Sequence, residues 1–203
     1  LHLSIRRQRQ MCIRDRITTI VKLAVEKILK KNVLVVGAGI KTGLNIRIDN
    51  PAQLGSDLVV DSVAAIVEYP APLLIFDLGT ANTVCVIDKN KNYIGGMIYP
   101  GIGVSLDSLT AHASQLGGIS IEAPEHMIGK NTTECMKSGL IYSSAAAMDG
   151  IIDRLQEQLG GEATVIATGG LAKKIVPHCR REIILDDDLL LKGLAIIYKK
   201  NRK

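Results

Sequence analysis

The chain has 203 residues, of which 47% are hydrophobic and 22% are charged, a balance typical of a globular protein that buries a sizeable core. The formal charge of +5 comes from the two ends, because residues 1–31 hold nine basic residues against two acidic ones and residues 199–203 hold four basic residues. Between residues 32 and 198, twelve basic residues stand against eighteen acidic ones, so the charge does not favour a nucleic-acid partner.

The first sixteen residues are rich in arginine and lack the apolar stretch of a secretory signal. We interpret residues 1–16 as a leader that is foreign to the fold. No run reaches the ~18 consecutive apolar residues of a membrane span, so we expect no membrane association and a cytoplasmic location. The cysteines lack metal-ligand spacing and are expected to be reduced thiols: Cys12, Cys85, Cys135 and Cys179.

Three elements are predicted in the first part of the chain. Apolar residues at helical spacing predict an amphipathic helix from Ile17 to Leu29. The apolar run Val33–Val36 predicts a short buried strand. A second helix is predicted over residues 56–68, with Ser56 or Asp57 as its N-cap.

Two prolines, Pro70 and Pro72, mark the expected start of a second domain, because closely spaced prolines end regular structure. We therefore assign residues 17–70 and residues 71–203 to different domains.

The second domain is predicted to begin with a meander of three antiparallel strands, followed by helices, a strand and further helices. This order is typical of an RNase H-like α/β domain. The predicted strands are Leu73–Phe76, Thr83–Ile87, a third near Tyr93–Ile94 and Thr164–Ala167, and the longer predicted helices cover residues 103–116 and 132–159.

The hairpin between the first two of these strands is the most informative segment. Asp77 ends an apolar strand, and Gly79 and Thr80 follow in the turn. A carboxylate beside free backbone N–H groups and a hydroxyl suits a cation and a phosphate. The alternative is an ordinary polar β-turn.

Three other segments have two interpretations each. The glycines Gly169 and Gly170 follow a strand and let the backbone approach a nucleotide, or they only cap a helix. Asp57 is a functional acid or a plain helix cap. Asp186–Asp188 resembles a metal cluster, but we expect a solvated acidic turn before the last helix.

Five motifs occur together and in order, and their combination resembles the type III pantothenate kinase family over most of the chain. They are Asn50-Pro51 with Gly55-Ser56-Asp57, Asp77-Leu78-Gly79-Thr80-Ala81, Gly95-Gly96-Met97-Ile98-Tyr99-Pro100-Gly101, Ile128-Gly129-Lys130-Asn131-Thr132 and Ala167-Thr168-Gly169-Gly170-Leu171.

The resemblance implies the fold of the acetate and sugar kinase/actin superfamily, with two RNase H-like domains: residues 17–70 would be the remnant of an incomplete N-terminal domain and residues 71–203 the C-terminal domain. It also implies a homodimer and ATP-dependent phosphorylation of pantothenate to 4′-phosphopantothenate, the first step of coenzyme A biosynthesis. It implies ATP with Mg²⁺ and a monovalent cation, K⁺ or NH₄⁺. The implied pantothenate site comprises Gly55, Ser56, Asp57, Leu58 and Thr132, with Asp57 as catalytic base; Asp77 would hold the cation, and Thr80, Gly79, Gly169 and Gly170 would bind ATP.

Two departures from the family pattern stand out. Leu58 follows the predicted base where many members carry arginine, which removes a phosphate or carboxylate contact. An N-terminal phosphate loop of the Asp-x-Gly-Asn-Thr type is not found in the sequence. We therefore expect the chain as given not to turn over. Two alternatives to the kinase are a non-catalytic accessory factor for transcription and another ATPase of the superfamily, such as a sugar kinase.

Overall fold

The structure is a computed structural model that describes residues 17–202. The chain forms two compact units, one ending at Ile40 and one spanning Lys41–Lys203. In the first unit, residues 17–29 form the predicted helix. The strand predicted at Val33–Val36 is wrong, because these residues join no sheet in the described part of the chain. An apolar run becomes a strand only where a neighbouring strand accepts its backbone hydrogen bonds.

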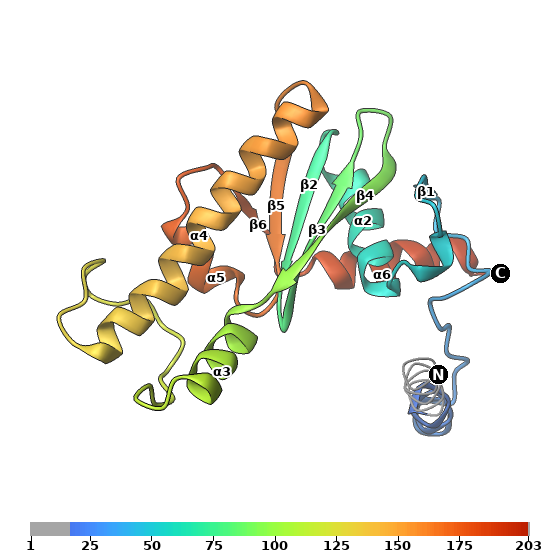
Figure 1. Ribbon diagram of the computed structural model, residues 1–203. Coiled ribbons are helices and arrows are strands. Elements are labelled where there is room, and N and C mark those ends of the chain that lie inside the picture. The colour runs from blue at the N-terminus through green and yellow to red at the C-terminus, as the bar shows by residue number, and fades with distance from the viewer. Residues whose placement is uncertain (1–16, 203) are drawn as a thin grey trace, which may run out of the picture. The chain divides into compact units, whose positions relative to one another are not determined.

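The second unit is built on a single six-stranded sheet with the order β1-β4-β3-β2-β5-β6 (Figure 1). The pairs β2–β3 and β3–β4 are antiparallel, whereas β1–β4, β2–β5 and β5–β6 are parallel. The predicted meander of three antiparallel strands is therefore confirmed. The strands are β1 (Asn45–Ile46), β2 (Leu73–Leu78), β3 (Ala81–Ile87), β4 (Asn92–Pro100), β5 (Thr164–Thr168) and β6 (Ile184–Leu185).

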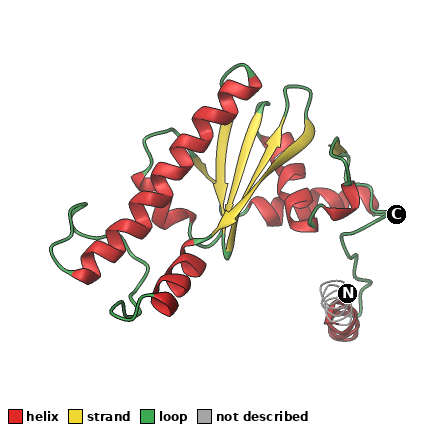
Figure 2. Ribbon diagram, viewed as in Figure 1, coloured by secondary structure: helices red, strands yellow, loops and turns green. Residues whose placement is uncertain are grey.

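Helices cover both faces of this sheet, as the red ribbons on either side of the yellow strands show (Figure 2). One face carries α2 and α6, and the other carries α3, α4 and α5. The predicted helices at residues 56–68 and 132–159 are confirmed at the predicted bounds. The helices are η1 (Pro51–Gln53), α2 (Ser56–Glu68), α3 (Ile102–His112), α4 (Thr132–Leu159), α5 (Ala172–Ile175), η2 (Val176–His178) and α6 (Leu189–Asn201).

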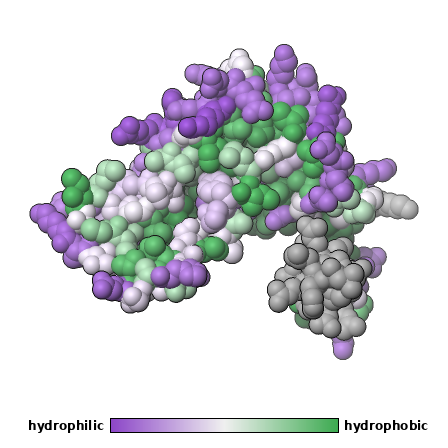
Figure 3. Space-filling view, in the orientation of Figure 1, coloured by the Kyte–Doolittle hydropathy of each residue, from purple (hydrophilic) through white to green (hydrophobic). Residues whose placement is uncertain are grey.

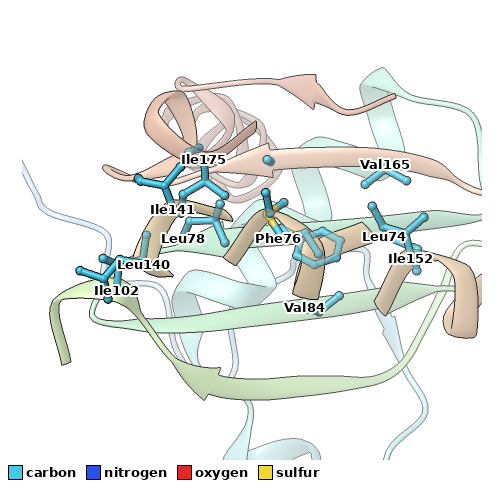
Figure 4. Packing of buried hydrophobic residues seen from close by; sticks show 14 of the residues in the cluster. Leu74, Phe76, Leu78, Val84, Ile102, Leu140, Ile141, Ile152, Val165 and Ile175 are labelled. Atoms are coloured by element: carbon cyan, nitrogen blue, oxygen red, sulfur yellow. The ribbon is translucent and has the colours of Figure 1, made fainter. Parts of the chain in front are cut away.

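Two core clusters follow from the alternation of side chains along the strands. Phe76 and its neighbours on one face of the sheet pack against α3, α4 and α5, with the ring of Phe76 completely buried (Figure 4). On the other face, Ile75 and Cys85 pack beneath α2 and α6. The odd-numbered residues of β2 and β3 therefore face α2, which decides where the polar residues at the strand ends point.

Close packing of α6 on α2 depends on Gly193. A Cβ atom at this position would clash with the backbone carbonyl of Val60, so only glycine lets the two helices approach this closely. The polar residues at the start of α6 add to this contact, since Lys192 forms an ion pair with Glu68 of α2 at 2.8 Å.

Asp186 corrects the expectation of a fully solvated acidic turn. It is only 6% exposed, and its carboxylate accepts hydrogen bonds from the Tyr69 hydroxyl at 2.8 Å and from the Lys192 ammonium at 2.7 Å. Burial opposes its ionisation, but the hydrogen bonds from Lys192 and Tyr69 and the charge of Lys192 together hold the pKa of Asp186 below its usual value. Asp187 and Asp188 are exposed, as expected.

The prolines that predict a domain boundary lie in the loop between α2 and β2, inside the unit that spans residues 41–203. Because α2 packs on the same sheet as the later elements, the origin of residues 17–70 in a separate domain stays a prediction. Among the described residues, no helix combines the length and the apolar character that crossing a membrane requires.

Candidate active site

The turn between β2 and β3 is held in place by Gly101, the residue that precedes α3. Asp77 is the penultimate residue of β2 and is half-buried, whereas Thr80 in the turn is exposed. The backbone N–H of Gly101 donates to the Thr80 carbonyl at 3.0 Å, and a Cβ atom on Gly101 would clash with the Gly79 carbonyl. The predicted phosphate-binding turn is therefore held in one conformation by the residue that precedes α3.

A second turn, after β5, lies against the same hairpin. Gly169 has a φ of +93°, and a Cβ atom there would clash with the Asp77 carboxylate and lie 2.7 Å from the backbone nitrogen of Leu78. Leu171 donates its N–H to the Leu78 carbonyl at 3.1 Å. The structure thus brings the predicted Gly169-Gly170 turn into contact with the predicted Asp77 turn, and it explains why the first of these glycines is needed.

Asp57 lies in the first turn of α2 and is exposed. Its carboxylate accepts a hydrogen bond from the N–H of Leu58 at 3.0 Å, and a Cβ atom on Gly55 would clash with this carboxylate. The prediction of Ser56 or Asp57 as N-cap is wrong, because Gly55 is the N-cap residue. Asp57 is therefore not the N-cap residue, although its carboxylate accepts one N–H group of the first helical turn.

Asp77 and Asp61 are carboxyl groups with raised pKa values. Burial raises the pKa of Asp77, and the negative charge of Asp57 raises it further. Asp61 responds more strongly: burial, then the charges of Asp77, Asp57 and Asp186, raise its pKa from 3.8 to about 7. The site therefore contains a third carboxyl group, and no basic residue is among the causes that shift the pKa of Asp77 or of Asp61.

Sequence analysis missed Asp61. It follows Asp57 by four residues, so the helical period places both carboxyl groups on the same side of α2. Its side chain is buried, with 2% of the residue exposed, and its Oδ1 atom has no hydrogen-bond partner among the described residues. The spacing was visible in the sequence, but the burial depends on how α2 packs against the sheet.

The structure separates Leu58 from Thr132. Leu58 is half-buried and packs against the core cluster beneath α2. Thr132 begins α4, which covers the opposite face of the sheet. Asn131 caps that helix by accepting the N–H of Glu134 at 2.9 Å. Within the described chain, Thr132 is therefore not brought together with Asp57, and both substrate roles stay predictions.

Thiol chemistry plays no part in this arrangement. Cys85, Cys135 and Cys179 are free, and burial raises the pKa of Cys85 and of Cys179 to about 12. In the part of the chain that the structure describes, no three His, Cys, Asp or Glu side chains are arranged to hold a metal ion. The site offers carboxylates, hydroxyls and backbone groups, which suit phosphate and hard cations.

The fold and this pair of turns define the class of protein. Two solved structures share the fold: a putative Baf family transcriptional activator from Campylobacter jejuni (TM-score 0.52, 22% identity, covering 79% of this chain and 70% of that one) and the ethanolamine utilization protein EutJ from Carboxydothermus hydrogenoformans (TM-score 0.51, 14% identity, covering 90% and 72%). Both are less than 25% identical to this chain, so the likeness shows a shared fold, and the mixed α/β architecture expected from the sequence is confirmed.

The particular family follows from sequence. A model of the type III pantothenate kinase family matches residues 9–154. Type III pantothenate kinases from an Exiguobacterium species, Bacillus cytotoxicus and Exiguobacterium sibiricum are 46%, 46% and 48% identical over 84%, 87% and 83% of this chain. The chain belongs to the type III pantothenate kinase family. It spans 66%, 67% and 66% of the lengths of these three relatives.

Proposed function

We propose that this chain carries the active site of an enzyme that transfers the γ-phosphoryl group of ATP to the primary hydroxyl of pantothenate, giving 4′-phosphopantothenate for coenzyme A biosynthesis in the cytoplasm. The observation that carries the proposal is the packing of α2, which bears Asp57 in the family's substrate motif, on the strand that bears Asp77. The charge of Asp57 accordingly raises the pKa of Asp77. Family membership supplies the two substrates.

Asp57 is the proposed catalytic base. Its carboxylate lies at the exposed start of α2 and Asp57 is not the N-cap residue, so it is available to an acceptor hydroxyl. As the hydroxyl oxygen attacks the γ-phosphorus, its proton passes to the Asp57 carboxylate, the bond between the γ-phosphorus and the bridging oxygen breaks, and ADP leaves with the electron pair. Gly55, Ser56 and Leu58 form the neighbouring part of the proposed pantothenate site.

The two turns are the proposed ATP site, with ATP bound as its Mg²⁺ complex. The exposed Thr80 hydroxyl and the backbone of Gly79 face solvent beside the turn of Gly169 and Gly170. Backbone N–H groups in such turns bind phosphate oxygens without a side chain that would block the approach. The contact between Gly169 and Asp77 keeps the two turns together in the absence of nucleotide.

A monovalent cation, K⁺ or NH₄⁺, is proposed at Asp77. The residues present fit such a group, because Asp77 and Asp61 are acidic and buried oxygen atoms beside them lack hydrogen-bond partners within the described residues. When bound, the cation would offset the repulsion between these carboxylates and the phosphates of ATP. Asp77 is the residue that would hold it.

A homodimer is proposed as the active assembly. Thr132 and Asp57 lie on opposite faces of the sheet, so Thr132 reaches a pantothenate beside Asp57 only if a second copy supplies it. The loop before Thr132 exposes two apolar side chains, Met127 at 65% and Ile128 at 83%. Figure 3 shows the mixed apolar surface over α3 and this loop, which contrasts with the hydrophilic upper end of α4. Such a surface suits a protein partner.

A non-catalytic regulator is the second candidate, because one structural neighbour is titled a putative transcriptional activator. A regulator needs no base, so two carboxyl groups coupled in one site favour the kinase. ADP release should be measured with ATP and pantothenate, with ATP and a sugar, and with ATP alone, both for this chain and for the chain joined to the part of the Exiguobacterium relative that it does not match. Pantothenate-dependent release supports the kinase, whereas no release under any condition contradicts it.

A further inference from the structure

The hydroxyl of Thr83 lies beside Asp77. The two residues are direct register partners in the antiparallel pair β2–β3, so their side chains project from the same face of the sheet. The Oγ1 atom of Thr83 is buried and has no hydrogen-bond partner among the described residues. A buried hydroxyl without a partner costs free energy, and natural proteins leave few such groups unsatisfied.

Asp61 is a buried residue of α2, the helix that covers this face of the sheet. This helix packs on β2 and β3, and Asp77 is the charged group that acts most strongly on the Asp61 carboxyl group. The residue is 2% exposed, and its Oδ1 atom also lacks a partner in the described chain. Its neighbourhood contains acids and no base: Asp77 on β2, Asp57 on its own helix and Asp186 before α6. Lys192, the nearest base of that network, is already paired with Asp186 and Glu68.

We propose that Asp61 and Thr83 are further ligands of the cation that Asp77 holds, so that the cation is bound from α2 as well as from the hairpin. The inference rests on the proposed function, which assigns a cation to Asp77 alone. Two buried oxygen atoms without partners and one half-buried carboxylate lie on three elements that pack together, and oxygen ligands are what a hard cation requires. A cation there would also pair the buried charge of Asp61, which is otherwise uncompensated.

The arrangement has a consequence for cation dependence. Because α2 supplies both Asp61 and the proposed base Asp57, a cation bound between α2 and the hairpin would fix the position of that helix relative to the ATP turns. The cation would therefore stabilise the folded chain even without substrate, by mass action on the folded state alone. This gives a readout that does not depend on catalysis.

The test is thermal unfolding of the 203-residue chain, followed by circular dichroism at fixed pH and ionic strength, in potassium chloride and in choline chloride. Potassium should raise the Tm by about 2–4 °C. This is the shift expected when the potassium concentration is a few times the Kd of the site. Asp61→Asn and Thr83→Val should each lose most of this shift. The control Asp107→Asn, which removes an exposed carboxylate from α3, should keep it.

In choline chloride, Asp61→Asn should be at least as stable as the unmodified chain, because the amide leaves no buried charge unpaired. This separates loss of the cation from failure to fold. If Asp77→Asn abolishes the potassium shift while Asp61→Asn and Thr83→Val keep it, the inference is overturned and the proposed cation at Asp77 survives. If potassium does not raise the Tm of the unmodified chain, both the inference and the proposed cation at Asp77 are contradicted.

Discussion

Single residues decide how the two turns of the site meet. Gly169 combines a left-handed backbone with a contact to Asp77 that leaves no room for a side chain. Its neighbour Gly170 has open space around it and no such backbone constraint. The two glycines look equivalent in the sequence, but only the first has a structural reason to be glycine.

Gly169→Ala should therefore lower the free energy of unfolding by about 1–3 kcal/mol, because alanine is strained at this φ and its Cβ atom displaces the Asp77 carboxylate. Gly170→Ala is the matched control and should change stability little. Urea unfolding of both variants measures the difference. Equal stability of the two would mean that the turn rearranges without cost.

Asp186 gives a pH dependence at the residue scale. Its folded-state pKa is lowered, so its contribution to stability is present above the unfolded value of about 3.9 and is lost as the pH falls through the folded value. Tyr69→Phe removes one of its hydrogen bonds and should cost about 1 kcal/mol at neutral pH. The difference from the unmodified chain should shrink as the pH falls below ~4, because the unfolded chain then binds a proton at Asp186 and the folded chain does so only at a lower pH.

Tyr198→Phe is the control for this experiment, because Tyr198 is exposed on α6. Unfolding by urea should be followed from neutral to acidic pH for both variants. A Tyr69→Phe penalty that persists unchanged in acid would show that the hydroxyl stabilises the protein by some contact other than the ionised Asp186.

At the scale of elements, the contact of α6 with α2 holds the helix that carries Asp57 and Asp61. Gly193→Ala should push the helices apart, because the added Cβ atom clashes with the Val60 carbonyl. We expect a loss of about 1–3 kcal/mol, larger than the ~1 kcal/mol that alanine gains over glycine in a helix.

Gly139→Ala provides the comparison for Gly193→Ala. Gly139 lies on α4 with nothing near its missing Cβ atom, so alanine there should raise stability by up to ~1 kcal/mol. Opposite signs for the two substitutions are the expected result. If Gly193→Ala is also stabilising, α6 does not depend on close approach to α2.

Elements with a strong local pattern could be predicted from the sequence. The helices α2 and α4 and the meander β2–β4 follow from periodicity and turn residues, which act over short distances. The run Val33–Val36 has the composition of a strand but no partner strand among the described residues. The two-residue strand β1 is too short to carry a pattern, and it depends on pairing with β4.

The residues of the candidate site likewise divide into those that a local motif predicts and those that depend on the packing of distant elements. Asp57 and Asp77 could be found because each follows a recognisable motif. Asp61 and Thr83 could not, because their importance depends on the register of β2 with β3 and on which side of α2 faces the sheet. The burial of Asp186 likewise depends on α2 and α6, which are distant in sequence.

At the scale of the whole molecule, the account joins family membership to one arrangement of carboxylates. The family sets the expected reaction, and the fold packs α2, which bears Asp57, on the strand whose terminal turn meets the turn after β5. The chain spans about two thirds of the length of its relatives, so its activity is best judged when it is joined to the part of the Exiguobacterium relative that it does not match.

The central claim is that Asp57 removes the proton from the acceptor hydroxyl. The most direct test compares pantothenate-dependent ADP release and ATP binding in this joined protein with and without Asp57→Asn, using Asp107→Asn as control. The account predicts that Asp57→Asn lowers turnover by roughly 10²–10⁴ while the Kd for ATP stays unchanged. Unchanged turnover in Asp57→Asn would contradict it.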